Sequence, residues 1–227
     1  MKNNTQAVVL EPRGEHKASV IWLHGLGADG HDFEPVIPAL QLPEDHGVKF
    51  IFPHAPERPV TINGGMVMRA WYDIKEMDLR KREDTDGIED SRQVIEAFIK
   101  SEKEAGIPAD KILLAGFSQG GVVILHTGLR HSEPLAGLLA LSTYLALPET
   151  LAGEADPANS KIPIFMAHGT MDPIIPVHQG KNSADQLQQQ GYPVDWHEYP
   201  IQHAVSLEEI EEIGRWISAR LLIRDST

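Results

Sequence analysis

The 227-residue sequence contains no cysteine, which excludes disulfide bonds and metal sites built from thiolates. It also lacks a long apolar run: the longest, Leu135–Leu141, is far shorter than the ~20 residues that a membrane helix needs. No apolar segment typical of a secretory leader follows residues 1–4. These absences predict a cytoplasmic protein with no stable membrane insertion.

Basic residues are scarce beside acidic ones. The chain has 20 Lys and Arg against 33 Asp and Glu, which gives a formal net charge of −13. Such a charge repels phosphate backbones and anionic lipid headgroups, so nucleic acid is not an expected partner. Hydrophobic residues make up 41% of the chain and no linker-like stretch divides it, so residues 1–227 are expected to form a single domain around one core.

Short β-rich runs alternate with segments of helical spacing. The runs that we predict as strands are Ala7–Leu10, Ser19–Leu23, Val48–Phe52, Ile112–Phe117, Leu135–Leu141, Ile162–Ala167 and Val194–Tyr199. Helical spacing is clearest in Ser91–Ala105 and in the last segment, where Ser206 and Glu209 form a capping box. The alternation predicts an α/β fold: a mostly parallel sheet of about seven strands, flanked by helices, with an antiparallel first strand.

A G-x-S-x-G sequence, Gly116-Phe117-Ser118-Gln119-Gly120, joins the fourth predicted strand to a following apolar helix. This context makes Ser118 a candidate nucleophile, because a sharp strand-to-helix turn holds the serine hydroxyl out at the edge of the sheet. The pattern alone also occurs by chance. Its position between a strand and a helix is what strengthens the prediction.

Two further residues lie where a serine mechanism requires them. In hydrolases of this architecture the chain order is serine, acid, histidine, each on a loop after a strand. Asp172 follows the strand Ile162–Ala167, and His203 follows the strand Val194–Tyr199. His203 is therefore the candidate base, and Asp172 is the candidate group that orients its ring.

Other acids and bases compete for these roles. The alternatives are Asp156, Asp195, His168 and His178. Asp156 precedes the strand Ile162–Ala167, and Asp195 lies near the start of the strand Val194–Tyr199. Both alternative bases precede that final strand. Asp172 itself could simply shape the turn before a proline. Chain order favours Asp172 and His203.

A second glycine motif, Gly25-Leu26-Gly27-Ala28-Asp29-Gly30, follows an early predicted strand and matches a dinucleotide-binding loop. That interpretation needs an acidic residue at the tip of the next strand. The sequence there reads Phe52-Pro53-His54-Ala55 and contains no acid, so it does not favour a dinucleotide site. A hydrolase uses such a loop differently, as half of an oxyanion hole. We then expect the backbone amides of Leu26 and Gln119 to be its donors.

Taken together, these residues resemble a known family. The matching segments are 24–30, 52–56, 71–73, 116–121, 168–169, 172–173 and 203. They are similar to small carboxylesterases related to acyl-protein thioesterases and lysophospholipases, over nearly the whole chain, and Arg69–Ile74 looks most like the bacterial carboxylesterase branch. The resemblance implies an α/β-hydrolase fold without a separate cap domain, acting on acyl esters or thioesters with neither a metal nor an organic cofactor. Family members can also form homodimers.

The same resemblance implies that residues 56–87, a connection without clear periodicity, and Tyr144 border the acyl chain of the substrate. Ile74 and Met77 are the candidate substrate-binding residues in that connection, although they could instead pack the loop onto the sheet. For Trp71–Tyr72 the packing role is the favoured one.

These observations predict a serine carboxylesterase that works through an acyl-enzyme intermediate. An acyl-protein thioesterase or lysophospholipase with the same three residues is the enzymatic alternative. A hydrolase fold kept only as a binding module is the non-enzymatic alternative, and the presence of a complete serine, acid and histidine set argues against it.

Overall fold

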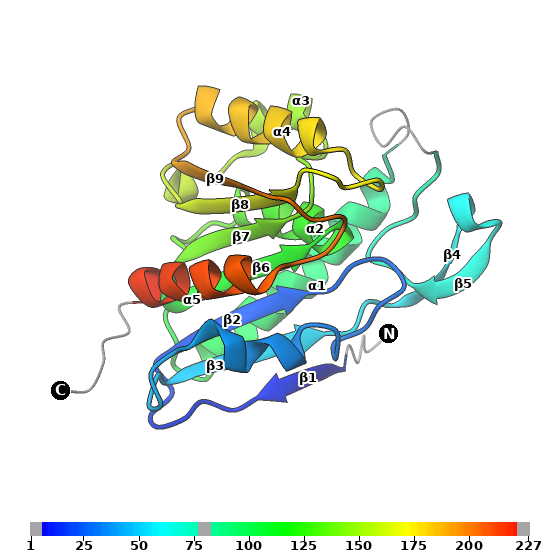
Figure 1. Cartoon of the computed structure of the whole chain (residues 1–227). Helices are drawn as coiled ribbons and strands as arrows, with labels where there is room; N and C mark the ends of the chain where they lie inside the picture. Colours follow the sequence, from blue (N-terminus) through cyan, green and yellow to red (C-terminus); the bar gives the residue numbers. More distant parts are fainter. Residues whose placement is uncertain (1–5, 77–82, 222–227) are drawn as a thin grey trace.

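A computed structural model describes residues 6–76 and 83–221. Its central sheet consists of β1 (Ala7–Leu10), β2 (Ala18–Leu23), β3 (Val48–Pro53), β6 (Ile112–Phe117), β7 (Gly137–Leu141), β8 (Ile164–Gly169) and β9 (Val194–Tyr199). The order across the sheet is β1-β3-β2-β6-β7-β8-β9 (Figure 1), with β1 antiparallel to β3 and the other pairings parallel. The predicted architecture is confirmed, including the antiparallel first strand.

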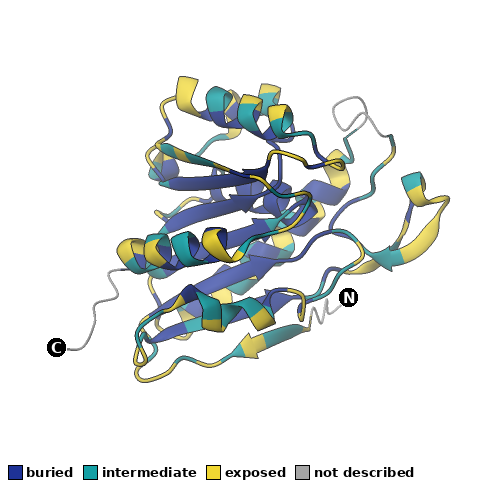
Figure 2. Cartoon of the chain, viewed as in Figure 1, coloured by how far each residue is buried: buried dark blue, intermediate teal, exposed yellow. Residues whose placement is uncertain are grey.

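Helices cover both faces of this sheet. They are α1 (Thr85–Glu104), α2 (Gln119–Gly128), α3 (Pro148–Glu154), α4 (Val177–Gln189) and α5 (Leu207–Leu221). Buried residues of α1 to α4 pack on one face, whereas α5 and the 3₁₀ helix η1 (Glu34–Leu40) pack on the other. Successive strand residues alternate between the two cores, as Leu113 and Leu114 do. The inner strands β2, β3, β6, β7 and β8 are therefore buried on both faces, whereas the edge strands β1 and β9 are partly exposed (Figure 2).

Two helices illustrate how far local sequence determines these elements. In α5 the predicted capping box is present: the Glu209 amide donates to Ser206 Oγ at 3.1 Å, and the Ser206 amide donates to Glu209 Oε2 at 3.3 Å. Helix α1 begins six residues earlier than the predicted Ser91, at Thr85. The extra turn is stabilised by Ile88, which is fully buried.

Among the described residues, no helix combines the length and apolar character needed to span a membrane.

The connection 56–87 differs from the structureless loop expected from the sequence. It contains an antiparallel hairpin of β4 (Glu57–Val60) and β5 (Met66–Arg69), which pair with each other and form a separate two-stranded sheet (Figure 1). Its turn uses Gly64 and Gly65, both with positive φ. The strands are only four residues long and one contains a proline, so alternation was too brief to reveal them.

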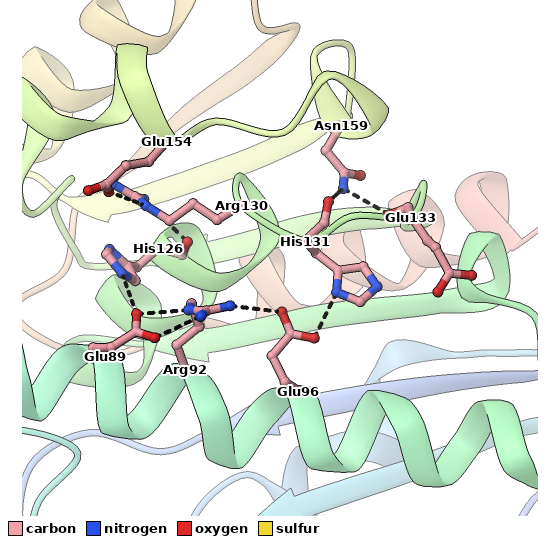
Figure 3. Close-up of polar contacts among 9 residues, drawn as sticks. All are labelled: Glu89, Arg92, Glu96, His126, Arg130, His131, Glu133, Glu154 and Asn159. Atoms are coloured by element: carbon pink, nitrogen blue, oxygen red, sulfur yellow. Dashed lines mark hydrogen bonds and ion pairs between the residues drawn. The ribbon is translucent and has the colours of Figure 1, made fainter.

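A polar network fastens α1 to α2 and the segment after it (Figure 3). Arg92 of α1 pairs with Glu89 at 2.7 Å and with Glu96 at 3.4 Å, and Glu96 in turn lies 2.8 Å from His131 Nδ1. The ring of His126 approaches Glu89 at 3.6 Å, and burial lowers the pKa of His126 to about 4. Helix α2, which begins directly after the candidate nucleophile, is thereby held at its far end.

Candidate active site

Ser118 lies in a strained turn between β6 and α2. Its backbone has φ 54° and ψ −118°, a conformation that residues other than glycine rarely adopt. A Cβ added at Gly116 would lie 2.4 Å from the carbonyl of Gly120, and one added at Gly120 would lie 2.6 Å from the carbonyl oxygen of Leu23. The two glycines therefore let the strand, the helix and β2 approach closely enough to form the turn.

The structure brings Ser118, Asp172 and His203 together at the carboxyl ends of β6, β8 and β9. His203 Nε2 lies 2.9 Å from Ser118 Oγ, and His203 Nδ1 lies 2.6 Å from Asp172 Oδ2. Because an ionised carboxylate only accepts hydrogen bonds, Nδ1 carries the proton, and Nε2 presents its lone pair to the serine hydroxyl. This tautomer is the one that can remove a proton from Ser118.

Asp172 is held by backbone groups as well as by His203. Its side chain is fully buried, and Oδ1 accepts hydrogen bonds from the amides of Ile174 and Ile175 at 2.8 and 2.9 Å. Together with the imidazole, these donors satisfy a buried carboxylate and fix its orientation. Asp172 therefore also shapes its turn, as the alternative interpretation of this residue held, while keeping one oxygen for His203.

The alternative residues do not contact the serine. His168 is buried, its Nε2 donates to the Ile175 carbonyl at 2.7 Å and lies 3.4 Å from Asp172 Oδ2, and burial lowers its pKa. His178 lies on α4. Asp156 accepts a hydrogen bond from an amide two residues on, and Asp195 lies 3.0 Å from a histidine on its own strand. None of these four has Ser118 as a hydrogen-bond partner in the described part of the chain.

Sequence reasoning missed one residue at this site, Thr143. Its hydroxyl, buried beyond the end of β7, donates to the carbonyl of Ser118 at 2.7 Å. The amide of Ser118 donates to the carbonyl of Leu141 at 2.8 Å. The end of β7 and the residues just after it therefore bind both backbone polar groups of Ser118. The sequence signal that could have indicated Thr143 is its position, because it is a hydroxyl residue just after β7, the strand next to β6.

The glycine loop 25–30 is tied down by residues around it. His24 Nδ1 donates to the Gly25 carbonyl at 2.7 Å, while Nε2 accepts from the Ala55 amide at 3.1 Å. Burial lowers the pKa of His24 to about 4, so the ring is neutral and can donate at one nitrogen while accepting at the other. The Gly27 amide donates to the Arg69 carbonyl at 2.9 Å, which joins the loop to β5.

The two expected oxyanion donors lie at the ends of these fixed segments. Leu26 follows Gly25 in the tethered loop, and Gln119 is the first residue of α2, where a helix leaves its amides without internal acceptors. Within residues 6–76 and 83–221, neither amide donates to another group of the chain. Both amides therefore lack an acceptor among the described residues.

The side chain of Gln119 connects the nucleophile turn to the segment after β5. Its Oε1 accepts from the Trp71 amide at 2.8 Å, and its Nε2 donates to the Tyr72 carbonyl at 2.7 Å. The Trp71 indole donates to the His24 carbonyl at 2.9 Å and is fully buried. Each such bond contributes about 1 kcal/mol, and leaving either buried backbone group unpaired would cost more. Trp71 and Tyr72 thus pack the connection onto the fold, as favoured from the sequence.

The three candidate substrate-binding residues have different positions. Ile74 is partly buried and packs against the core cluster that contains Tyr144. Tyr144 is buried, its hydroxyl lies 3.2 Å from that of Tyr72, and burial raises its pKa to about 12. It borders a small cavity of about 160 Å³. Met77 lies outside the described residues.

Comparison with known proteins agrees with this geometry. A model of the phospholipase/carboxylesterase family matches residues 4–221. The chain belongs to this family. The acyl-protein thioesterase 1 of Neurospora crassa is 42% identical over 91% of this chain and 88% of its own length, and that of Gibberella zeae is 39% identical over 94% and 95%.

Solved structures give the same assignment. The acyl-protein thioesterase 2 of Zea mays has a TM-score of 0.85 at 30% identity, covering 96% of this chain and 99% of its own. The fold is therefore the α/β-hydrolase fold, and the chain is a serine hydrolase of the acyl-protein thioesterase and carboxylesterase type. The expected bacterial branch is not supported, because these 39–42% identical relatives are fungal.

Proposed function

We propose that the protein hydrolyses carboxylic acyl esters through an acyl-enzyme formed on Ser118. The observation that carries the proposal is the continuous hydrogen-bonded chain from Ser118 Oγ to His203 at 2.9 Å and from His203 to Asp172 at 2.6 Å. A serine beside a correctly oriented base, in a strained strand-to-helix turn, is the arrangement that acyl transfer requires.

In the first half of the reaction, Ser118 Oγ forms a bond to the acyl carbon while its proton passes to His203 Nε2. The tetrahedral intermediate then expels the alcohol, which takes the proton from Nε2 as its bond to the acyl carbon breaks. A water molecule attacks the acyl-enzyme with His203 as base, and the Ser118 hydroxyl re-forms as the acid leaves. Asp172 stabilises the charged imidazole throughout.

The oxyanion of the tetrahedral intermediate would bind the free amides of Leu26 and Gln119. Loss of one such donor typically costs ~3–4 kcal/mol of transition-state stabilisation, so the tethering of loop 25–30 and of α2 matters for rate. The acyl group would extend past Ile74 and Tyr144, whose hydroxyl is neutral at any ordinary pH because burial raises its pKa to about 12.

The test is steady-state hydrolysis of p-nitrophenyl esters from acetate to palmitate by the parent protein and by Ser118→Ala. We expect one preferred chain length in the parent and a loss of about 10⁴–10⁶-fold in kcat in the variant. Ser218→Ala, on α5, is a matched control that should retain activity. Equal activity in the parent and in Ser118→Ala would contradict the proposal.

Thioester hydrolysis is the second candidate. It is favoured by the fungal acyl-protein thioesterases, which are 39–42% identical to this chain. The same residues suffice, because a thiolate leaving group needs less protonation than an alkoxide. Hydrolysis of an S-acylated peptide and of an ester of the same acyl chain should be compared by kcat/KM. A higher value for the thioester would assign the leaving group as a thiol.

A further inference from the structure

The segment Trp71–Ile74 has no regular secondary structure, yet side chains of two helices bind its backbone. Ser91 of α1 donates its hydroxyl to the carbonyl of Trp71. Gln119, the first residue of α2, binds the Trp71 amide at 2.8 Å and the Tyr72 carbonyl at 2.7 Å. Further along, Asp84 Oδ2 accepts from the Asp73 amide at 2.9 Å, and the Ile62 amide donates to the Ile74 carbonyl at 2.9 Å. The position of this segment is therefore set by discrete contacts, most of them from side chains, and not by a strand ladder.

The Gln119 contact differs from the Ser91 contact because it reaches the nucleophile turn. Gln119 follows Ser118 directly, and its backbone amide is a proposed oxyanion donor. Its side chain is buried and uses one acceptor and one donor in a single plane, which only a carboxamide supplies. One residue thus connects the reaction centre to a segment that lies 47 residues away in sequence.

The same segment also faces the proposed acyl site. The Tyr72 hydroxyl lies 3.2 Å from the Tyr144 hydroxyl, and Tyr144 follows Thr143, which binds the Ser118 carbonyl. Ile74 packs against the core cluster to which both tyrosines belong. A displacement of the segment would therefore alter the wall beside an acyl group attached to Ser118.

We infer that Gln119 is a positioning residue whose side chain couples the oxyanion amide to the acyl-facing segment Trp71–Ile74, and so sets acyl-chain selectivity as well as turnover. The inference rests on the proposed acyl transfer at Ser118. In the proposed acyl-enzyme, an acetyl group would end close to Ser118, whereas a longer chain would extend along the segment. A shift of the segment therefore affects long substrates more than short ones, although Gln119 need not touch the chain.

The first experiment compares Gln119→Met, which keeps the length but removes both hydrogen bonds, with Ser91→Ala, which removes the bond to α1 alone. The kcat and KM are measured on p-nitrophenyl acetate and octanoate. We expect Gln119→Met to change the octanoate-to-acetate ratio of kcat/KM by about fivefold or more, and Ser91→Ala to leave it within about twofold. An unchanged ratio in Gln119→Met, or the same change in both variants, overturns the inference.

A second measurement does not depend on catalysis. Residue-resolved hydrogen exchange of the Trp71 amide is measured in the Ser118→Ala background with and without Gln119→Met, and we expect exchange about tenfold or more faster without the glutamine. Unchanged protection overturns the inference. If Gln119→Met does not fold, Gln119→Glu, which keeps the acceptor but removes the donor, is measured by the same criteria. A parent inactive on all esters would sink the proposed function, while faster Trp71 exchange would still support the structural link.

Discussion

Asp172 and His203 are joined by a 2.6 Å hydrogen bond between Oδ2 and Nδ1, and the other oxygen of Asp172 is occupied by two backbone amides. The carboxylate thus has one oxygen for the turn and one for the imidazole. The ring tautomer depends on the second oxygen alone, which separates the structural role of Asp172 from its chemical role.

Asp172→Asn should lower kcat about 10⁴-fold with little change in stability. The amide oxygen of the asparagine can still accept from the amides of Ile174 and Ile175. Its NH₂ group, however, faces His203 Nδ1 and places the ring proton on Nε2, so that Nε2 can no longer accept a proton from Ser118. Ester hydrolysis and thermal unfolding check both halves. Asp195→Asn, at the alternative acid, should be active; an active Asp172→Asn would remove Asp172 from the mechanism.

Thr143→Val should reduce kcat about three- to tenfold and stability by about 1 kcal/mol, because it removes the donor to the Ser118 carbonyl without changing side-chain shape. The carbonyl keeps a bond from the Gly121 amide at 3.0 Å, which limits the loss. Thr143→Ser retains the hydroxyl and should restore the rate. Equal kcat values for the valine and serine variants would show that the hydroxyl has no positioning role.

Gly120→Ala should destabilise the protein by about 3 kcal/mol or more, since its Cβ would lie 2.6–2.7 Å from the carbonyl oxygens of Leu23 and His24. These are backbone atoms, so β2 and α2 would have to separate. Gly153→Ala is the matched control: its Cβ meets nothing within 4 Å and α3 should gain up to about 1 kcal/mol. Urea unfolding measures both, and similar stabilities for the two variants would contradict the close-approach explanation.

The stability of the protein should fall as pH decreases from 6.5 towards 4, partly through His126. Burial lowers the pKa of His126 from 6.5 to about 4, so the unfolded chain binds this proton first. The stabilisation is complete above pH 6.5 and is lost as the pH falls through that window; His24 acts in the same direction.

His126→Leu should therefore reduce the loss of unfolding free energy between pH 7 and pH 4.5 by about 2–3 kcal/mol. The surrounding charges are Glu89, Arg92 and Arg130, and they remain in the variant. Urea unfolding at the two pH values is the measurement. His178→Leu, outside this network on α4, serves as control. If His126→Leu kept the full pH dependence of the parent, the stability loss would belong to other groups.

The parts of the fold predicted from sequence are those in which local pattern and global burial agree. The inner strands β2, β3, β6, β7 and β8 are short, mainly apolar runs because they are covered on both faces, and the capping box of Ser206 and Glu209 is complete within four residues. The order of Ser118, Asp172 and His203 followed from one rule about strand ends. The β4–β5 hairpin was missed because its strands are brief and largely unburied.

The contacts of Thr143 and Gln119 could not be read from any local pattern. They span 25 and 47 residues of sequence, and each depends on how closely the nucleophile turn or the start of α2 approaches an irregular segment. Periodicity reports which face of an element is buried, but it does not report which backbone group a buried polar side chain will find. The residue types of Thr143 and Gln119 show that each can form hydrogen bonds, but the partner of each is defined only by the geometry of the turn around Ser118.

The β4–β5 hairpin exchanges ladder hydrogen bonds with itself and none with the central sheet in the described part of the chain. It is joined to the catalytic framework at discrete points, through Arg69 to the glycine loop and through Gln119 to the residues just beyond it. A change in the hairpin's length or in its exposed side chains would therefore leave the ladder of the central sheet intact, as long as these points of attachment are kept.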